Sequence, residues 1–155
     1  MRPLGPLEAV RLALRRWRDF GGRSRRSEFW WFQFAYVLVL ALAWVAEGDR
    51  AVLFGYGPLT LAAEAVLFVP GLAVGMRRLQ DTGHEGWLYV PMMAAVFVPG
   101  TWWDSLAFLL VFGVYQLGLI ILLVRDGIQG PNAWGQSPKF AQQRSLALTR
   151  TGTSP

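Results

Sequence analysis

The feature that most constrains the fold is a block of 20 residues, 105–124, that carries no charged side chain. It contains seven Leu, two Ile, three Val and two Phe. Near the middle of a bilayer each of these residues favours insertion by about 0.3 to 0.6 kcal/mol, so together they contribute roughly −4 to −8 kcal/mol. A run of this length is what a helix needs to cross the hydrocarbon core. The block therefore predicts a transmembrane helix.

Three further apolar blocks precede it, at residues 29–46, 59–76 and 87–103. The first holds one polar residue, Gln33, and the second holds Glu64. The third is the shortest and contains Pro91 and Pro99, so it is a short span, a kinked span or a re-entrant segment. We predict an all-α membrane protein, a four-helix transmembrane bundle with an N-terminal amphipathic helix at the membrane interface.

Composition excludes several classes of protein. Hydrophobic residues make up 54% of the chain and charged residues only 16%, against roughly 25% charged in an ordinary soluble domain. The chain has no Cys and one His. These counts exclude disulfides, thiolate metal sites, cysteine nucleophiles and multi-histidine metal sites. We expect no metal and no cofactor.

The basic residues indicate the orientation in the membrane. Connections rich in arginine alternate with connections that are not: residues 1–28 and 125–155 are basic, the connection after the second span opens with Arg77 and Arg78, and Asp104 stands before the last span. The positive-inside rule then places both termini and residues 77–86 in the cytoplasm. Because the arginines flank hydrophobic spans, membrane topology accounts for them and we expect no nucleic-acid partner.

The two ends of the chain differ from the membrane domain, which we place at residues 23–138. Within residues 1–22, Leu7, Val10, Leu14 and Trp17 recur at helical spacing, with Arg11, Arg15 and Arg18 on another face. This pattern is typical of a helix that lies on the membrane with its arginines toward anionic head groups; anchoring alone would explain it equally. Residues 139–155 read as a mobile tail.

The polar residues between the spans suggest one candidate site. Asp81 follows Arg77 and Arg78 at helical spacing, and Gly83 is a natural place for a helix to stop. The stretch is either a salt-bridged loop or part of a composite site for an anionic head group or a partner protein. Asn132 begins a turn-rich segment that is either a docked tail or part of that site. The full candidate set is Arg23, Arg25, Arg26, Arg77, Arg78, Asp81 and Asn132.

Other polar residues are weaker candidates for a functional role. His84 stands near Asp81 and Glu85, but a lone histidine in a loop is more often solvated than a general base or a metal ligand. Glu64 is an ionisable residue within a span and so a candidate for an ion path, although it is close enough to the span's end to reach the interface. Gln33 and Gln116 are expected to form hydrogen bonds between helices. No catalytic residue is predicted.

Three segments together resemble one known family, the domain of unknown function 805 family of small bacterial inner-membrane proteins. They are residues 20–31, with Gly22, Arg23, Arg25 and Glu28; residues 69–87, with the paired arginines, Asp81, Thr82, Gly83 and Gly86-Trp87; and residues 130–138. The resemblance covers roughly residues 12–138. Gln80 stands where the family usually has His, and His84-Glu85 where a basic residue and Ser are common. The resemblance implies an integral inner-membrane protein and supplies no substrate, cofactor or catalytic residue.

These observations favour a non-enzymatic scaffold or regulatory protein whose arginine motifs bind anionic lipid head groups or a partner, either another membrane protein or a second copy of the chain. Two alternatives remain open. One is a small oligomeric transporter or channel that uses Glu64 and Gln116. The other is an enzyme acting on lipid head groups through Asp81 or His84.

Overall fold

The computed structural model describes residues 4–48, 57–98 and 100–138 of the chain, and in these ranges it contains helices and no β-strand. The predicted tail, 139–155, lies outside the described residues. Six of the described elements are α-helices, three of them long, and two are short 3-10 helices. In chain order they are α1 (Pro6–Arg15), α2 (Arg26–Glu47), α3 (Pro58–Asp81), the 3-10 helix η2 (Gly86–Tyr89), α4 (Val90–Ala94), the 3-10 helix η3 (Ala95–Phe97), α5 (Gly100–Trp103) and α6 (Leu106–Val124).

Helices α2, α3 and α6 are each long and apolar enough to cross a membrane. They contain the blocks predicted at 29–46 and 59–76 and nearly all of the block at 105–124. The end of α3 differs from the expectation, because the helix continues past residue 76 to Asp81. Arg77 and Arg78 therefore lie on the last turns of a helix and not in a loop.

The fourth apolar block, 87–103, is not a continuous helix. Helices η2, α4 and η3 run together from Gly86 to Phe97, Val98 is extended with ψ at 126°, and α5 follows. An extended residue is expected directly before Pro99, because the proline ring disfavours helical backbone at the preceding residue. The helical part alone is about 18 Å long at 1.5 Å per residue, well short of a hydrocarbon core of about 30 Å.

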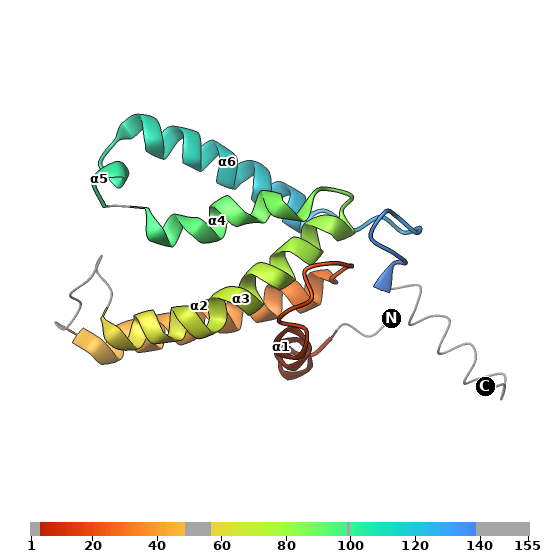
Figure 1. Ribbon diagram of the computed structural model, residues 1–155, viewed down its shortest axis with the longest axis horizontal. Helices are drawn as coiled ribbons and strands as arrows, with labels where there is room; N and C mark the ends of the chain where they lie inside the picture. Colours follow the sequence, from red (N-terminus) through yellow and green to blue (C-terminus); the bar gives the residue numbers. More distant parts are fainter. Residues whose placement is uncertain (1–3, 49–56, 99, 139–155) are drawn as a thin grey trace.

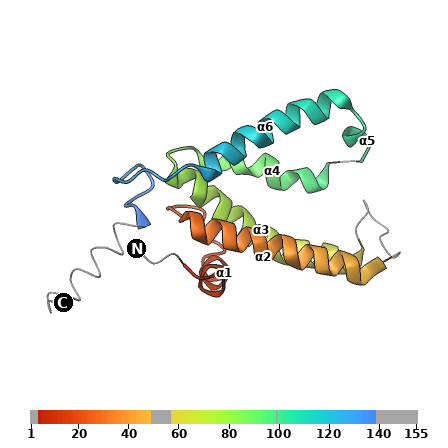
Figure 2. The same ribbon diagram turned by 180° about the vertical axis from the view of Figure 1, so that it is seen from behind.

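The helices form two antiparallel pairs (Figures 1 and 2). Helices α2 and α3 make one pair, and the segment from Gly86 to Phe97 makes the other with α6. The pairs meet where α3 ends and diverge toward the opposite end, with α5 at the far turn of the second pair. The start of α2, the end of α3 and the end of α6 thus share one end of the molecule, called the arginine end below.

Both ends of α3 are closed by recognisable caps. At its start the Glu47 carboxylate, from the last residue of α2, accepts hydrogen bonds from Gly57 N at 3.0 Å, Thr60 N at 3.1 Å and Thr60 Oγ1 at 2.5 Å. At its end Gly83 has a positive φ of 85°, and His84 N donates to Leu79 O at 3.0 Å. This is a Schellman motif, which needs a residue that tolerates left-handed backbone. The expectation that the helix stops at Gly83 is confirmed.

The core lies between the two pairs near the arginine end, and close backbone approach shapes it. Phe29, Phe32 and Tyr36 of α2 pack with Val74 and Leu79 of α3 and with Tyr89. The Tyr89 ring lies directly over Gly75, where a Cβ atom would come within 2.1 Å of the ring. The first helix, α1, packs against α2 and α3 and buries Ala9 and Ala13 completely.

Candidate functional site

Three arginines and two carboxylates form a buried cluster at the arginine end. The arginine cluster consists of Arg23, Glu28, Arg77, Arg78 and Asp81, which come from the segment before α2, from the first turn of α2 and from the last turns of α3. Arg77 and Arg78 have no exposed surface at all, and Arg23 is 4% exposed. Charged groups are almost never buried to this degree unless they are paired. The contacts of each arginine show how the pairing is achieved.

Arg77 joins α3 to the end of α1. Its Nη1 donates to Arg16 O at 2.8 Å and to Asp19 O at 2.6 Å, where α1 has just ended. Its Nη2 donates to Glu28 Oε1 at 3.0 Å, in a salt bridge with both side chains buried. The free carbonyls at a helix end carry partial negative charge, so a guanidinium is a favourable partner for them.

Arg78 does the same for α6. Its Nε donates to Leu123 O at 3.0 Å and its Nη2 donates to Arg125 O, so one guanidinium caps the C-terminal end of that helix. Its Nη1 donates to Asp81 Oδ2 at 2.7 Å. The predicted pairing of Asp81 with an arginine at helical spacing is confirmed for Arg78.

Arg23 joins the start of the membrane domain to the C-terminal segment. Its Nε donates to Asp81 Oδ1 at 2.8 Å, so Asp81 bridges two arginines. Its Nη1 donates to Gly130 O at 2.6 Å, and its Nη2 donates to Ile128 O. The C-terminal segment is thus held by a side chain that lies more than a hundred residues earlier in the sequence.

Asn132 fixes the same segment from the other side. Its Nδ2 donates at 2.8 Å to Gln80 O, a carbonyl in the last turn of α3 that also accepts from Gly83 N, and its Oδ1 accepts from Trp134 N at 3.0 Å. Gly135 has a φ of 114°, which lets the chain turn back so that Asn132 and Gly135 exchange two backbone hydrogen bonds. The structure therefore brings all three sequence segments of the candidate site together.

Two of the candidate arginines lie at the edge of the cluster. Arg25 is half-buried and its Nη2 donates to Pro138 O. Arg26 is exposed and forms a salt bridge of 3.0 Å with Asp126, whose side chain is 67% exposed. Exposure thus divides the candidate set: Arg23, Arg77, Arg78 and Asp81 are internal, and Arg26 faces outward.

A second polar region lies within the apolar part of the molecule. A groove of about 560 Å³ separates α2 and α3 from the segment 86–97. Glu64 lines it, and its Oε1 accepts a hydrogen bond of 2.5 Å from the hydroxyl of Tyr36, which stands at the middle of α2. Gln33 lines it as well, and its Oε1 accepts a hydrogen bond of 3.3 Å from Tyr89. Met92, Met93 and Trp103 provide apolar walls.

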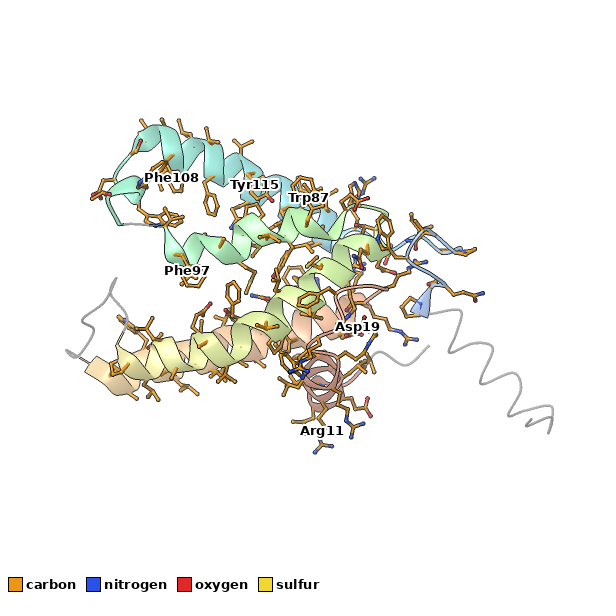
Figure 3. The ribbon with its side chains drawn as sticks, in the orientation of Figure 1. Arg11, Asp19, Trp87, Phe97, Phe108 and Tyr115 are labelled. Carbon is orange, nitrogen blue, oxygen red and sulfur yellow. The ribbon has the colours of Figure 1, made fainter. Side chains whose placement is uncertain are left out.

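The groove is bounded by aromatic contacts near its open end. Phe97 projects from the end of the second pair toward the first (Figure 3), and its ring lies 5.5 Å from that of Phe68 on α3. On the other side, Trp103 packs edge-on against Phe108 and Phe112 of α6. The two pairs are therefore joined at the arginine end, and the rings of Phe68 and Phe97 bring them into contact again beyond the groove.

The remaining predicted polar residues lie elsewhere. Gln116 is on α6, does not line the groove, and its buried Oε1 has no hydrogen-bond partner among the described residues. His84 lies in the turn after α3, where its Nδ1 is 3.2 Å from Thr82 Oγ1. Within residues 4–48, 57–98 and 100–138 no group of three His, Asp or Glu side chains is placed to hold a metal ion.

Two structural roles were not visible in the sequence. Glu47, which directly follows the apolar block 29–46, caps α3. Gln80, which stands where the related family usually has His, donates from Nε2 to Phe20 O at 3.1 Å and ties the segment after α1 to α3. The one sequence signal for the capping role of Glu47 is its position: an acidic residue ends one span, and a Gly-Pro pair starts the next.

Comparison with known proteins agrees with the membrane character of the chain. Two inner membrane proteins of Escherichia coli strain K12 are similar: YhaI, 30% identical over 130 residues (82% of this chain and 92% of YhaI), and YhaH, 32% identical over 135 residues (82% of this chain and 93% of YhaH). No solved structure matches the chain. Residues 17–136 match the family described as "Protein of unknown function (DUF805)", and this range includes the arginine cluster and the groove. The chain belongs to the DUF805 family.

Proposed function

We propose that the chain is a non-enzymatic protein of the bacterial inner membrane that binds anionic lipid head groups at its arginine end and acts there as a scaffold. It crosses the membrane four times with both ends in the cytoplasm. The topology is supported by the meeting of the start of α2, the end of α3 and the end of α6 in one cluster. The chain must then return to the opposite end between α3 and α6, which the segment 86–97 and α5 accomplish together.

The observation that supports head-group binding is the exposed face of α1 and of the residues that follow it up to Arg18. Arg11, Arg15 and Arg18 are exposed there, and Arg11 points away from the rest of the molecule (Figure 3). The large apolar side chains Leu7 and Leu14 are 72% and 42% exposed, because α1 packs against its neighbours through Ala9 and Ala13 instead. An exposed apolar stripe flanked by arginines suits a helix that lies in the head-group region.

The arginine cluster has a supporting role in this proposal. Its guanidinium groups are occupied by carboxylates and helix-end carbonyls, so they fix α1 on the body and leave the outward arginines to meet phosphates. Arg26, with its exposed salt bridge, belongs to this outward set. Each basic residue near an anionic surface contributes about 1 kcal/mol.

The test is lipid content after purification. The triple variant Arg11→Ala, Arg15→Ala, Arg18→Ala should lose most of its co-purified phosphatidylglycerol in native mass spectrometry while keeping its thermal stability. The matched control replaces the same three residues by Lys, which keeps the charge and should keep the lipid. Wild-type lipid content in the alanine variant would overturn the proposal.

A second function, transport, is favoured by one specific observation, the groove with Glu64 in its wall. An ionisable side chain at membrane depth is costly and is a functional candidate by default. The chain reconstituted in liposomes would then give an ion or proton flux that Glu64→Gln abolishes. A flux that is absent, or that persists in the variant, removes this candidate.

A further inference from the structure

We infer that the groove between the two helix pairs is a binding site for a small hydrophobic organic cation, held by the carboxylate of Glu64. The inference is independent of head-group binding at the arginine end and of any transport.

The first step is the charge balance at Glu64. Its carboxylate has one hydrogen bond, from Tyr36, which neutralises no charge. Within the described part of the chain the nearest arginines along these helices are Arg77, thirteen residues beyond Glu64 on α3, and Arg26, ten residues before Tyr36 on α2. At 1.5 Å per residue these separations are about 20 Å and 15 Å. An ionised carboxylate in an apolar setting is stabilised by a partner of opposite charge, and none of the described side chains provides one.

The second step is the remaining hydrogen-bonding capacity of the groove. Gln33 accepts from Tyr89 through Oε1, and its Nε2 has no partner among the described residues. The second oxygen of Glu64 is likewise without a partner there. Polar side chains at membrane depth normally satisfy each other. Here both side chains line the same groove, Gln33 from α2 and Glu64 from α3, and each keeps a polar atom without a partner among the described residues.

The third step is the chemistry of the walls. Tyr36 and Trp103 offer aromatic rings and Met92 and Met93 offer thioethers. Aromatic faces attract cations, and more strongly where water is excluded, while methionines adapt to irregular apolar shapes. A carboxylate together with aromatic and thioether walls therefore favours a cation with apolar substituents over an anion or a polar solute.

The last step concerns size and access. The groove volume of about 560 Å³ falls in the range of sites that bind drug-sized ligands. It lies where the two pairs diverge, so its mouth faces the bilayer and a hydrophobic cation that has partitioned into the membrane can enter sideways. These properties suit a compact organic cation.

The experiment uses the full chain in lipid nanodiscs and two probes of the same shape and opposite charge, tetraphenylphosphonium and tetraphenylborate. Equilibrium binding of radiolabelled tetraphenylphosphonium should be saturable with one site per chain. Tetraphenylborate should show no binding above that of empty nanodiscs. Equal saturable binding of the two probes would mean that the groove is merely apolar, and the inference would fail.

Variants locate the site. Glu64→Gln removes the charge at nearly constant size and should weaken tetraphenylphosphonium binding at least tenfold, whereas the exposed Glu85→Gln, outside the groove, should bind as the wild type does. Glu64→Gln binding within twofold of the wild type overturns the inference. If that variant does not fold, Met93→Trp fills the groove while keeping the carboxylate, and it should abolish binding; undiminished binding to this variant overturns the inference equally.

Discussion

The arginine cluster and the groove are built on the same two helices, yet their charges are compensated in opposite ways. In the cluster, three guanidinium groups meet two carboxylates and backbone carbonyls at the ends of α1 and α6 and in the C-terminal segment. Of their nitrogens, Arg77 Nε alone has no partner in the described part of the chain. In the groove, one carboxylate meets a tyrosine hydroxyl and no cation of the described chain.

The difference teaches how to separate structural from functional polar residues in this fold. The charges of the cluster are compensated within the protein, which makes it a set of connections between α1, α3, α6 and the C-terminal segment. The groove leaves hydrogen-bonding groups and one carboxylate without partners, which is the property expected of a site that binds a ligand. Substitutions in the two regions should therefore differ in which property they change.

The largest effect is expected from Asp81→Ala. The substitution leaves Arg23 and Arg78 buried without their shared carboxylate, and breaking a buried pair in this way costs about 3–5 kcal/mol. We expect a loss of this size in the free energy of unfolding, measured by denaturation in detergent micelles. Glu85→Ala, which removes an exposed carboxylate four residues later, should change the value by less than about 0.5 kcal/mol. Equal effects of the two substitutions would show that the cluster is not the main connection at this end.

A smaller effect is expected where the two helix pairs touch. Gly75→Ala places a methyl group within 2.1 Å of the position of the Tyr89 ring, and overpacking of this kind costs about 1–3 kcal/mol. The ring must move, so the bond from Tyr89 to Gln33 at the edge of the groove should be lost as well.

The control for Gly75 is the same substitution at Gly113 on α6, where nothing lies within 4 Å of an added Cβ. Alanine favours helix over glycine by about 1 kcal/mol, so Gly113→Ala should be neutral or stabilising in the same unfolding measurement. A loss at both positions would mean that the cost at Gly75 does not come from Tyr89.

The parts of the fold that could be predicted from the sequence are those governed by local pattern. Hydropathy located α2, α3 and α6 because each is a long apolar run. Helical spacing predicted that Asp81 pairs with Arg77 or Arg78, of which Arg78 is the partner, and the conformational freedom of glycine predicted the stop at Gly83. Each of these depends on residues within a few positions of one another.

The parts that could not be predicted depend on partners far apart in the chain. The partners of Arg77 and Arg78 are mainly backbone carbonyls, such as Arg16 O and Leu123 O, and every sequence offers carbonyls everywhere. Charge counting therefore placed these arginines in the cytoplasmic connection after the second span, as a salt-bridged loop or as part of a head-group or partner site. The groove was equally invisible, because it depends on the angle at which the two helix pairs diverge. The extended backbone of Val98 has a local cause, the proline that follows it. Its effect on the length of the span, however, depends on where the chain turns next.

The smallest effect on the free energy of unfolding is expected from Arg26→Ala. This variant tests most closely the contrast between polar groups that hold the fold and polar groups that meet a ligand. Arg26 and Arg23 belong to the same short motif, but Arg26 pairs with Asp126 in an exposed salt bridge. Arg23 is 4% exposed and binds Asp81 and three backbone carbonyls of the C-terminal segment. Exposed salt bridges contribute about 0–1 kcal/mol, so Arg26→Ala should leave the unfolding free energy nearly unchanged while Arg23→Ala lowers it by several times more. If the two variants are equally stable, burial does not decide what these arginines do. If Arg26→Ala alone loses bound phosphatidylglycerol, the motif combines one arginine that holds the fold with another that meets the lipid.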